Sequence, residues 1–437
     1  MSSWTFAELE EWDKKICKIG KSYGLDWHPI DYEIIDYREM IGAMAYSGLP
    51  SHYRHWSFGK QFEQTHTRYN LGMEGLPYEM IINSNPSISY LMTENPMSTH
   101  ILTMAHCIGH SDFFKNNRMF ANTDPDNVLM RFKSASKRIS SYMDDPSVGV
   151  ERVEQVLDAC HAVKYQTYRT PGIKRKSDKE MLEKYTELLN RTENKGNKIE
   201  LSKVPLEPEY NLLKFIRNHS RNLDEWERDV ISIVEYESHY FVPQAYTKIM
   251  NEGWACFIHE RIIKDLNLPQ EYHLAFIKLH NQVVRPHVGR VNPYHLGFKI
   301  FKKIEEEQGF EGCVMAREVH DDTAFLRKYL DEEMCRELNL FNYSYKRRQE
   351  ANTVDEISDI EGWKSVRDNL LTTVGLNSIP VVRVENVEKD HTLHLVHEHD
   401  GRDLDLGYAN KVLGYVVDLW GDEVKMNTII EDETWEF

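Results

Sequence analysis

The chain has 437 residues, of which 41% are apolar and nine are tryptophan, so it has enough material for a large core. This composition excludes a wholly disordered protein. The formal net charge of −17 argues against a nucleic-acid partner, because surfaces that bind phosphate need clustered lysine and arginine.

The N-terminus starts directly with an acidic, amphipathic helical pattern, "WTFAELEEWDKKI". It has neither the basic nor the apolar region of a signal peptide. The longest apolar runs are shorter than the roughly 18 residues that indicate a membrane span. The six cysteines lack paired spacing, which is typical of reduced thiols. The sequence therefore predicts a cytoplasmic protein without a membrane span.

Four regions follow one another along the chain. Residues 1–170 alternate helical patterns with aromatic loops punctuated by glycine and proline. Residues 171–208 are dense in charge and have proline near both ends, which predicts a linker or a surface excursion. Residues 209–370 are helical again, and residues 371–437 have the β-β-α-β order of a small α/β module. The fold class is mainly α, with a large helical body and this C-terminal module.

Two helices of the third region are well marked. "DEWERDVISIVEYESHYF" has apolar residues at 226, 230, 233 and 234, which form one helical face. "TKIMNEGWACFIHERIIKDL" predicts the next helix. Asn292-Pro293 then opens a third, since proline is tolerated in the first turn.

The helical segment "MAHCIGHSDFF" places His106 and His110 four residues apart. Residues at this spacing share a helix face, so both rings can reach one metal ion. The spacing is that of the zinc-protease motif H-E-x-x-H, but Cys107 stands where a protease has its catalytic glutamate. Buried histidines that are satisfied by hydrogen bonds are the alternative interpretation.

"NEGWACFIHERI" supplies a third candidate ligand. Glu252 lies on an otherwise apolar helix, where a carboxylate is costly to bury unless it is paired or binds a metal. His106, His110 and Glu252 would make a site of two histidines and one glutamate with an open position. The expected ion is divalent, zinc first and iron second. A salt bridge between Glu252 and an arginine is the alternative.

A rival set of ligands comes from two C-x-x-H pairs, Cys107/His110 and Cys256/His259, which together would form a closed structural zinc site. A hydrolase would also need a base in place of the missing glutamate. The sequence offers Glu237, Asp112 and His259 for that role. We predict Glu237 and His259 as catalytic residues, although a solvated acidic helix face explains Glu237 equally simply.

Two polar loops contain candidate substrate-binding residues: His55, Trp56, Asn83 and Asn85. Their rings and amides suit stacking and hydrogen bonding with a sugar or a peptide. Buried asparagines also commonly satisfy loop backbone, so a role in capping loops remains open.

Six segments resemble, in order and over nearly the whole chain, the SpoVR family (stage V sporulation protein R). They are "YRHWSFGKQFE" (53–63), "YEMIINSNPSISYLM" (78–92), "MAHCIGHSDFFKNN" (104–117), "YFVPQAYTKIMNEGWACF" (240–257), "NPYHLGFKIF" (292–301) and "HDGRDLDLGYANKVLGYVVDLWG" (399–421). The resemblance implies a role in forming the spore cortex, a modified peptidoglycan. The family also has members in bacteria that do not sporulate, and its name does not supply a reaction.

Three functions are compatible with these observations. The first is a metal-dependent hydrolase of an amide bond in a cell-wall peptide or its precursor, by analogy with the helical arrangement of glutamate-zincin peptidases. The second is a non-catalytic scaffold or regulator of sporulation with protein partners and a structural or vestigial metal site. The third is redox chemistry at an iron site, which predicts a second carboxylate beside the histidines.

Overall fold

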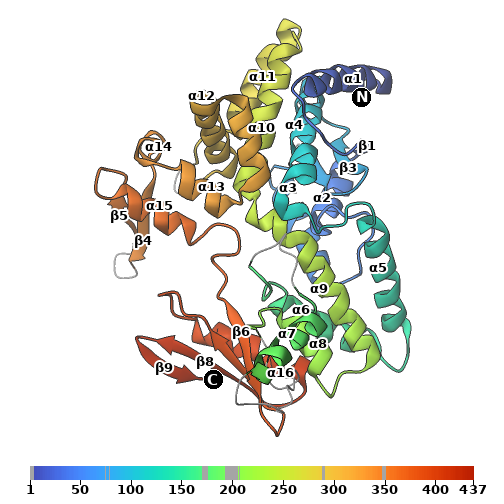
Figure 1. Ribbon diagram of the computed structural model, residues 1–437. Coiled ribbons are helices and arrows are strands. Elements are labelled where there is room, and N and C mark those ends of the chain that lie inside the picture. Colours follow the sequence, from blue (N-terminus) through green and yellow to red (C-terminus); the bar gives the residue numbers. More distant parts are fainter. Residues whose placement is uncertain are drawn as a thin grey trace. The chain divides into compact units, whose positions relative to one another are not determined.

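The computed structural model describes residues 4–73, 75–77, 79–169, 176–191, 205, 207–287, 291–346 and 351–437. The protein is mainly helical, as the sequence predicted (Figure 1). It divides into two compact units, Met1–Ser136 with Pro243–Ser378 and Lys137–Val242 with Ile379–Phe437. In the described part of the chain, no helix is both long and apolar enough to cross a membrane.

The charge-dense segment expected at 171–208 lies largely outside the described residues. Its described part includes helix α7 (Asp178–Arg191). The four domain ranges drawn from the sequence stay a prediction.

The first unit contains a three-stranded sheet of order β1-β3-β2. Strand β1 (Ile30–Ile35) pairs in parallel with β3 (Ser87–Met92), and β2 (Glu79–Ile82) pairs with β3 in antiparallel. Strand β3 is the central strand of this sheet, and every one of its residues is buried. The hairpin of β4 (Phe341–Lys346) and β5 (Ala351–Ile357) forms a separate two-stranded sheet in this unit.

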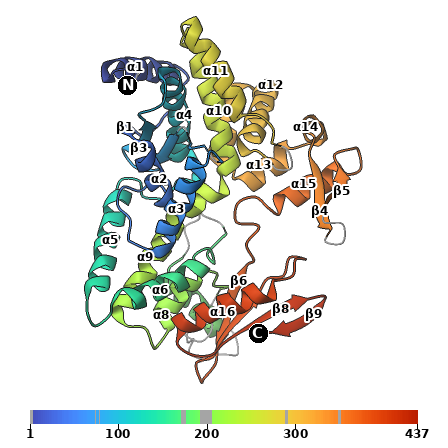
Figure 2. The same ribbon diagram turned by 180° about the vertical axis from the view of Figure 1, so that it is seen from behind.

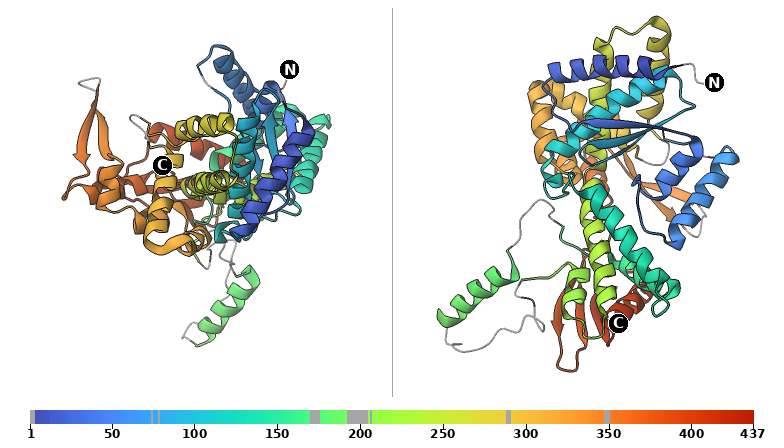
Figure 3. Two further views of the ribbon diagram at one scale, coloured as in Figure 1. Left: turned by 90° about the horizontal axis from the view of Figure 1, so that it is seen from above. Right: turned by 90° about the vertical axis from the view of Figure 1, so that its right-hand side faces the viewer.

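The helices of the first unit pack mainly around α4 (Met97–Asn116), α10 (Lys248–Asp265) and α12 (Pro293–Val319). Figure 3 shows α1 (Phe6–Ser22) lying across α4. The remaining helices of the unit are α2 (Tyr37–Ala45), α3 (Trp56–Asn70), the short 3-10 helix η1 (Arg118–Phe120), α11 (Gln270–Val283), α13 (Asp322–Tyr329), α14 (Glu332–Glu337) and α15 (Trp363–Leu371).

Helix α4 is the core of this unit. All of its residues from Met97 to Phe114 are buried. Because this stretch is buried on every side, its polar side chains must find partners inside the protein. The histidines of "MAHCIGHSDFF" are therefore buried among protein groups.

The starts of α10 and α12 are fixed by polar side chains. Asn292 caps α12 by accepting a hydrogen bond from Tyr294 N, as the Asn-Pro pair predicted. At the start of α10 the cap comes from α13, since the Asp322 carboxylate accepts hydrogen bonds from Ile249 N and Met250 N, both at 2.8 Å. The Asp322 cap holds the first turn of α10, and Glu252 follows directly after this turn.

The second unit combines helices with the C-terminal module. Strands β6 (Val382–Val387), β7 (Leu393–His397), β8 (Val424–Ile430) and β9 (Glu433–Glu436) form one sheet in that order. Helix α16 (Leu406–Trp420) connects the parallel strands β7 and β8 and lies against the sheet (Figure 2). The predicted β-β-α-β order is confirmed, with β9 as an additional strand. The other helices are α6 (Val150–Val163), α7, α8 (Leu212–His219), the C-terminal half of α5 (Val128–Asp144) and most of α9 (Glu225–Tyr246).

Candidate metal centre

Small residues let α4, α10 and α12 approach one another closely. A Cβ atom on Gly109 would lie 2.6 Å from Ala255 Cα, and one on Gly253 would lie 2.4 Å from Gly297 Cα. These distances are far below a normal contact, so both crossings depend on glycine. The residues of α10 next to these crossings are thereby brought against the histidine face of α4.

Four ionisable side chains meet beside the crossing of α4 and α10. His106 Nε2 lies 3.3 Å from Glu79 Oε1 and 3.9 Å from Glu252 Oε2, and His110 Nε2 lies 3.4 Å from the same Glu252 oxygen. The two histidines come from α4, Glu252 from α10 and Glu79 from the start of β2. The structure thus brings together the three residues predicted as metal ligands and adds a second carboxylate.

Electrostatics in this cluster favour an ionised glutamate. Burial alone would raise the pKa of Glu252, but His106 and His110 beside it hold that pKa well below its usual value. Burial would lower the pKa of His110, but Glu252 outweighs this effect and raises it. The charge of Glu252, together with burial, raises the pKa of Tyr294 well above its usual range. Among the residues that the structure describes, Glu252 pairs with His106 and His110 and with no arginine.

Neighbouring side chains orient both imidazole rings. His110 Nδ1 lies 2.9 Å from Asn251 Oδ1, which only accepts, so this nitrogen donates, and Nε2 is the atom turned toward Glu252. His106 Nδ1 lies 2.8 Å from His259 Nδ1, and His259 Nε2 lies 2.8 Å from His280 Nδ1. Metal-binding histidines are commonly oriented in this way, with Nδ1 held by a hydrogen bond and Nε2 turned to the metal, which displaces any proton there.

The cluster fits a divalent cation. Glu79, His106 and His110 can each offer one ligand atom within 4.8 Å of the others. His106 Nε2 and Glu252 Oε2 are both buried, and neither makes a hydrogen bond of normal geometry with the described residues. A buried polar atom without a hydrogen-bond partner commonly binds an ion or a water molecule. Two nitrogen and two oxygen donors suit zinc and iron alike.

A cavity of about 400 Å³ adjoins the cluster. It is lined by Glu79, His106, His259 and Tyr294, with Lys248 at the start of α10. Its volume is in the range of small-molecule sites. Two residues of the cluster therefore face a space that a substrate can occupy.

The predicted base Glu237 is buried on α9 in the second unit, where its charge acts on Lys164. Its catalytic role stays a prediction. His259 lies in the first unit as the hydrogen-bonding neighbour of His106. Burial, followed by the charges of the surrounding histidines, lowers the pKa of His259 well below its usual value, so the ring is neutral.

The candidate substrate-binding residues make structural contacts. His55 caps the start of α3, where Trp56 is half exposed. Asn83 Nδ2 donates to Thr123 Oγ1 at 2.8 Å, and Asn85 Nδ2 donates to an Asp126 oxygen at 2.7 Å. None of the four is among the described residues that line the cavity. These contacts agree with loop capping, and substrate binding by this set stays a prediction.

The closed zinc site of two C-x-x-H pairs is not assembled. Cys107 Sγ lies 3.1 Å from Ser89 Oγ of β3, so it points to the sheet. Cys256 and His259 instead lie beside His106.

Sequence reasoning missed four residues of the centre: Glu79, Asn251, His280 and Tyr294. Glu79, Asn251 and Tyr294 stand inside segments that were singled out, "YEMIINSNPSISYLM", "NEGWA" and "NPYHLGF", so their signal was membership of a resembling segment. His280 carries no such local mark.

Comparisons with known proteins agree on one family. A family model described as SpoVR like protein matches residues 3–379, and one described as SpoVR-like C-terminal domain matches residues 378–431. The chain is 33% identical to the "Uncharacterized protein YcgB" of Escherichia coli (strain K12), over 99% of this chain and 94% of that protein. No solved structure matches the chain significantly.

Proposed function

This chain belongs to the SpoVR family, and we propose that it is a metal-dependent hydrolase of an amide bond, with a cell-wall peptide or its precursor as substrate. The observation that carries the proposal is the position of Glu79. Its carboxylate lies 3.3 Å from His106 Nε2 and lines the adjoining cavity. A carboxylate in that position can replace the glutamate that is missing at position 107.

In this proposal His106, His110 and Glu252 hold the metal. A divalent ion supplies Lewis acidity, which polarises a carbonyl and lowers the pKa of water. Asn251 and His259 keep the two rings oriented through their Nδ1 atoms. The close contact at Gly109 sets the separation of α4 and α10, which carry the ligands, and the contact at Gly253 seats α10 against α12.

Glu79 is then the general base, since its carboxylate takes a proton from water in the cavity and passes it to the leaving amine. Tyr294 lines the same cavity, and its hydroxyl donates a hydrogen bond to the oxygen on which negative charge develops. We favour Glu79 over Glu237 as the base because Glu79 is in the cluster itself. His259 acts in this proposal by positioning His106.

The six cysteines are all free thiols, and five of them are buried, which supports a reducing compartment such as the cytoplasm. A role in the spore cortex rests on the family name and is part of the proposal.

The first test is metal content by mass spectrometry on protein purified without a metal-affinity tag and reconstituted with Zn²⁺ or Fe²⁺. We expect metal in the wild type and in His100→Ala, a buried histidine of the same helix outside the cluster. The double variant His110→Ala/Glu252→Ala should lose the metal of this site. Metal-free wild type after reconstitution would overturn the hydrolase and direct the search to protein partners.

The second test is amine release from synthetic cell-wall stem peptides and their amidated precursors. Glu79→Gln should keep the metal and lose about 10²-fold or more in rate, the usual contribution of a general base. Metal-loaded wild type that cleaves none of these peptides would refute the proposed substrate class.

Redox chemistry at an iron site is a second candidate, and the second carboxylate that it predicts is Glu79. The same variant separates the two functions. If Glu79 is a ligand to iron, then Glu79→Gln should bind iron much more weakly, whereas a base can be replaced without loss of metal.

A further inference from the structure

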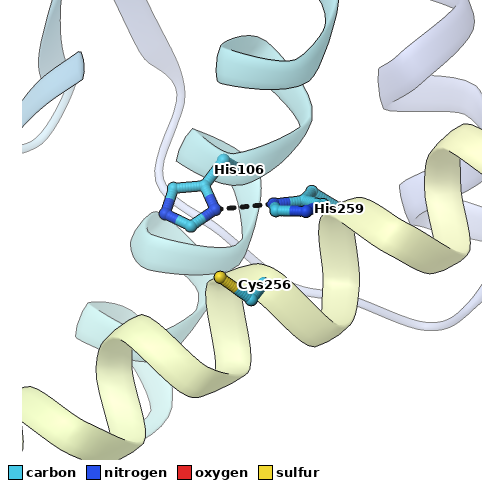
Figure 4. Close-up of side chains that lie close together, drawn as sticks. All are labelled: His106, Cys256 and His259. Carbon is cyan, nitrogen blue, oxygen red and sulfur yellow. Dashed lines mark hydrogen bonds between the residues drawn. The ribbon is translucent and has the colours of Figure 1, made fainter. Parts of the chain in front are cut away.

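We propose that His106 Nδ1, His259 Nδ1 and Cys256 Sγ form a second, thiolate-containing site for a borderline divalent ion such as zinc, with His106 bridging the two sites. The three side chains are fully buried and come from two helices (Figure 4). One ligand atom of each lies within 4.8 Å of the others. Cys256 and His259 stand one helical turn apart on α10, so both face α4.

The two ring nitrogens of His106 point to different neighbours. Nε2 is the atom near Glu79 and Glu252, whereas Nδ1 is the atom 2.8 Å from His259. A metal held by the carboxylates uses only Nε2. The opposite nitrogen binds a second ion when its proton is released to solvent, so that His106 bridges the two ions as an imidazolate. The Cys256 thiol likewise releases its proton to solvent and binds as a thiolate.

The separation of the two Nδ1 atoms is close to what a metal needs. Two nitrogens bound at about 2.0–2.1 Å to a tetrahedral ion lie about 3.3 Å apart. The observed 2.8 Å is that of a shared hydrogen bond, so the rings have to open by about 0.5 Å to exchange the proton for a cation. Small side-chain rotations of this size need no movement of the helices.

His280 prepares His259 for this role. The tautomer that carries its proton on His259 Nε2 donates to His280 Nδ1, at 2.8 Å, and leaves His259 Nδ1 bare toward His106. A ligand histidine held from behind by a hydrogen bond is the common arrangement in metal sites. His280 is thus a positioning residue of the second site.

The donor sets of the two sites differ in kind. Carboxylates and imidazoles at the first site suit harder ions, while a thiolate with two imidazoles favours zinc or copper. The second site does not depend on hydrolase activity, because it requires only that His106, Cys256 and His259 bind an ion.

The test is a Co²⁺ titration of the full-length, tag-free protein, with cobalt replacing zinc as a visible probe. We expect two equivalents bound per chain and a near-ultraviolet band from thiolate-to-cobalt charge transfer. Cys256→Ser should remove the band and one equivalent. The matched control is Cys107→Ser, another buried cysteine, whose sulfur contacts Ser89. This control should keep the charge-transfer band and both equivalents of cobalt.

One equivalent without the band would overturn the second site and leave the proposed hydrolase centre intact. One equivalent with the band would place the single ion at Cys256 and refute both the bridge and the proposed ligand set. No binding at all would refute both proposals. If Cys256→Ser does not fold, X-ray absorption at the cobalt edge of the wild type decides, since a spectrum without sulfur scattering would refute the site.

Discussion

The crossing of α10 and α12 at Gly253 offers a sharp test of how the fold builds the centre. In Gly253→Ala the new Cβ would lie 2.4 Å from both the Cα and the carbonyl carbon of Gly297. Both atoms are backbone, so no side chain can turn aside. An ordinary contact begins near 3.4 Å, and the helices must therefore separate by about 1 Å.

Overpacking of this kind costs about 1–3 kcal/mol, and the loss of a helical glycine returns less than about 1 kcal/mol. We expect a net loss of about 1–2 kcal/mol in the free energy of unfolding. Because Glu252 is the neighbouring residue, a shift of about 1 Å should also weaken metal binding at the proposed centre, since metal–ligand distances tolerate only about 0.2 Å.

Urea denaturation and metal content on the same preparations measure both effects. Gly59→Ala is the matched control, because this glycine of α3 has no atom within 4 Å of a built Cβ. The control should be stabilised slightly or unchanged. If Gly253→Ala unfolds at the wild-type urea concentration and keeps its metal, the close crossing is not what positions Glu252.

Three further outcomes are expected. Burial lowers the pKa of His100 to about 4. Between pH 6.5 and 4 the unfolded chain therefore binds a proton on this ring while the folded chain does not. The free energy of unfolding should fall as the pH drops through that window, by up to about 3 kcal/mol. The urea midpoint of His100→Leu should change less with pH across that window than the wild-type midpoint. An equal pH dependence in the two proteins would refute the lowered pKa of His100. Asp322→Ala should cost about 1–3 kcal/mol in urea denaturation by leaving two buried N–H groups at the start of α10 unpaired, with Asp322→Asn losing less. Asn251→Ala should weaken metal affinity about 10–100-fold in competition with a chelator, since His110 loses the partner of its Nδ1; unchanged affinity would exclude that role.

The sequence predicted the helices better than the sheets. Asn292-Pro293 marked the start of α12 correctly, because a cap residue and a first-turn proline act locally. The strands β1 to β3 were missed inside a region expected to be helical. The central strand "SISYLM" is buried on both faces and alternates polar with apolar residues only from Ser87 to Tyr90, which is too short a pattern to reveal a strand by itself. The hairpin of β4 and β5 was missed as well.

The candidate centre was predictable only where its ligands share an element. His106 and His110 are four apart on one helix, and the cost of burying Glu252 marked it on a second helix. Glu79 could not be found in this way. Its place depends on the antiparallel register that sets it opposite Leu91 in β3, and that pairing is a tertiary fact which no local spacing encodes.

The same sheet explains why Cys107 stands where a zinc protease has glutamate. Successive helical residues are about 100° apart, so position 107 lies beside the face that His106 and His110 share. In this protein that direction leads to β3, where Cys107 meets Ser89, and a glutamate there would be buried against the sheet. The carboxylate at the centre comes instead from β2, on the edge of the same sheet. The loss of H-E-x-x-H is therefore no evidence against a catalytic base, because Glu79 brings a carboxylate to the histidines from a different element.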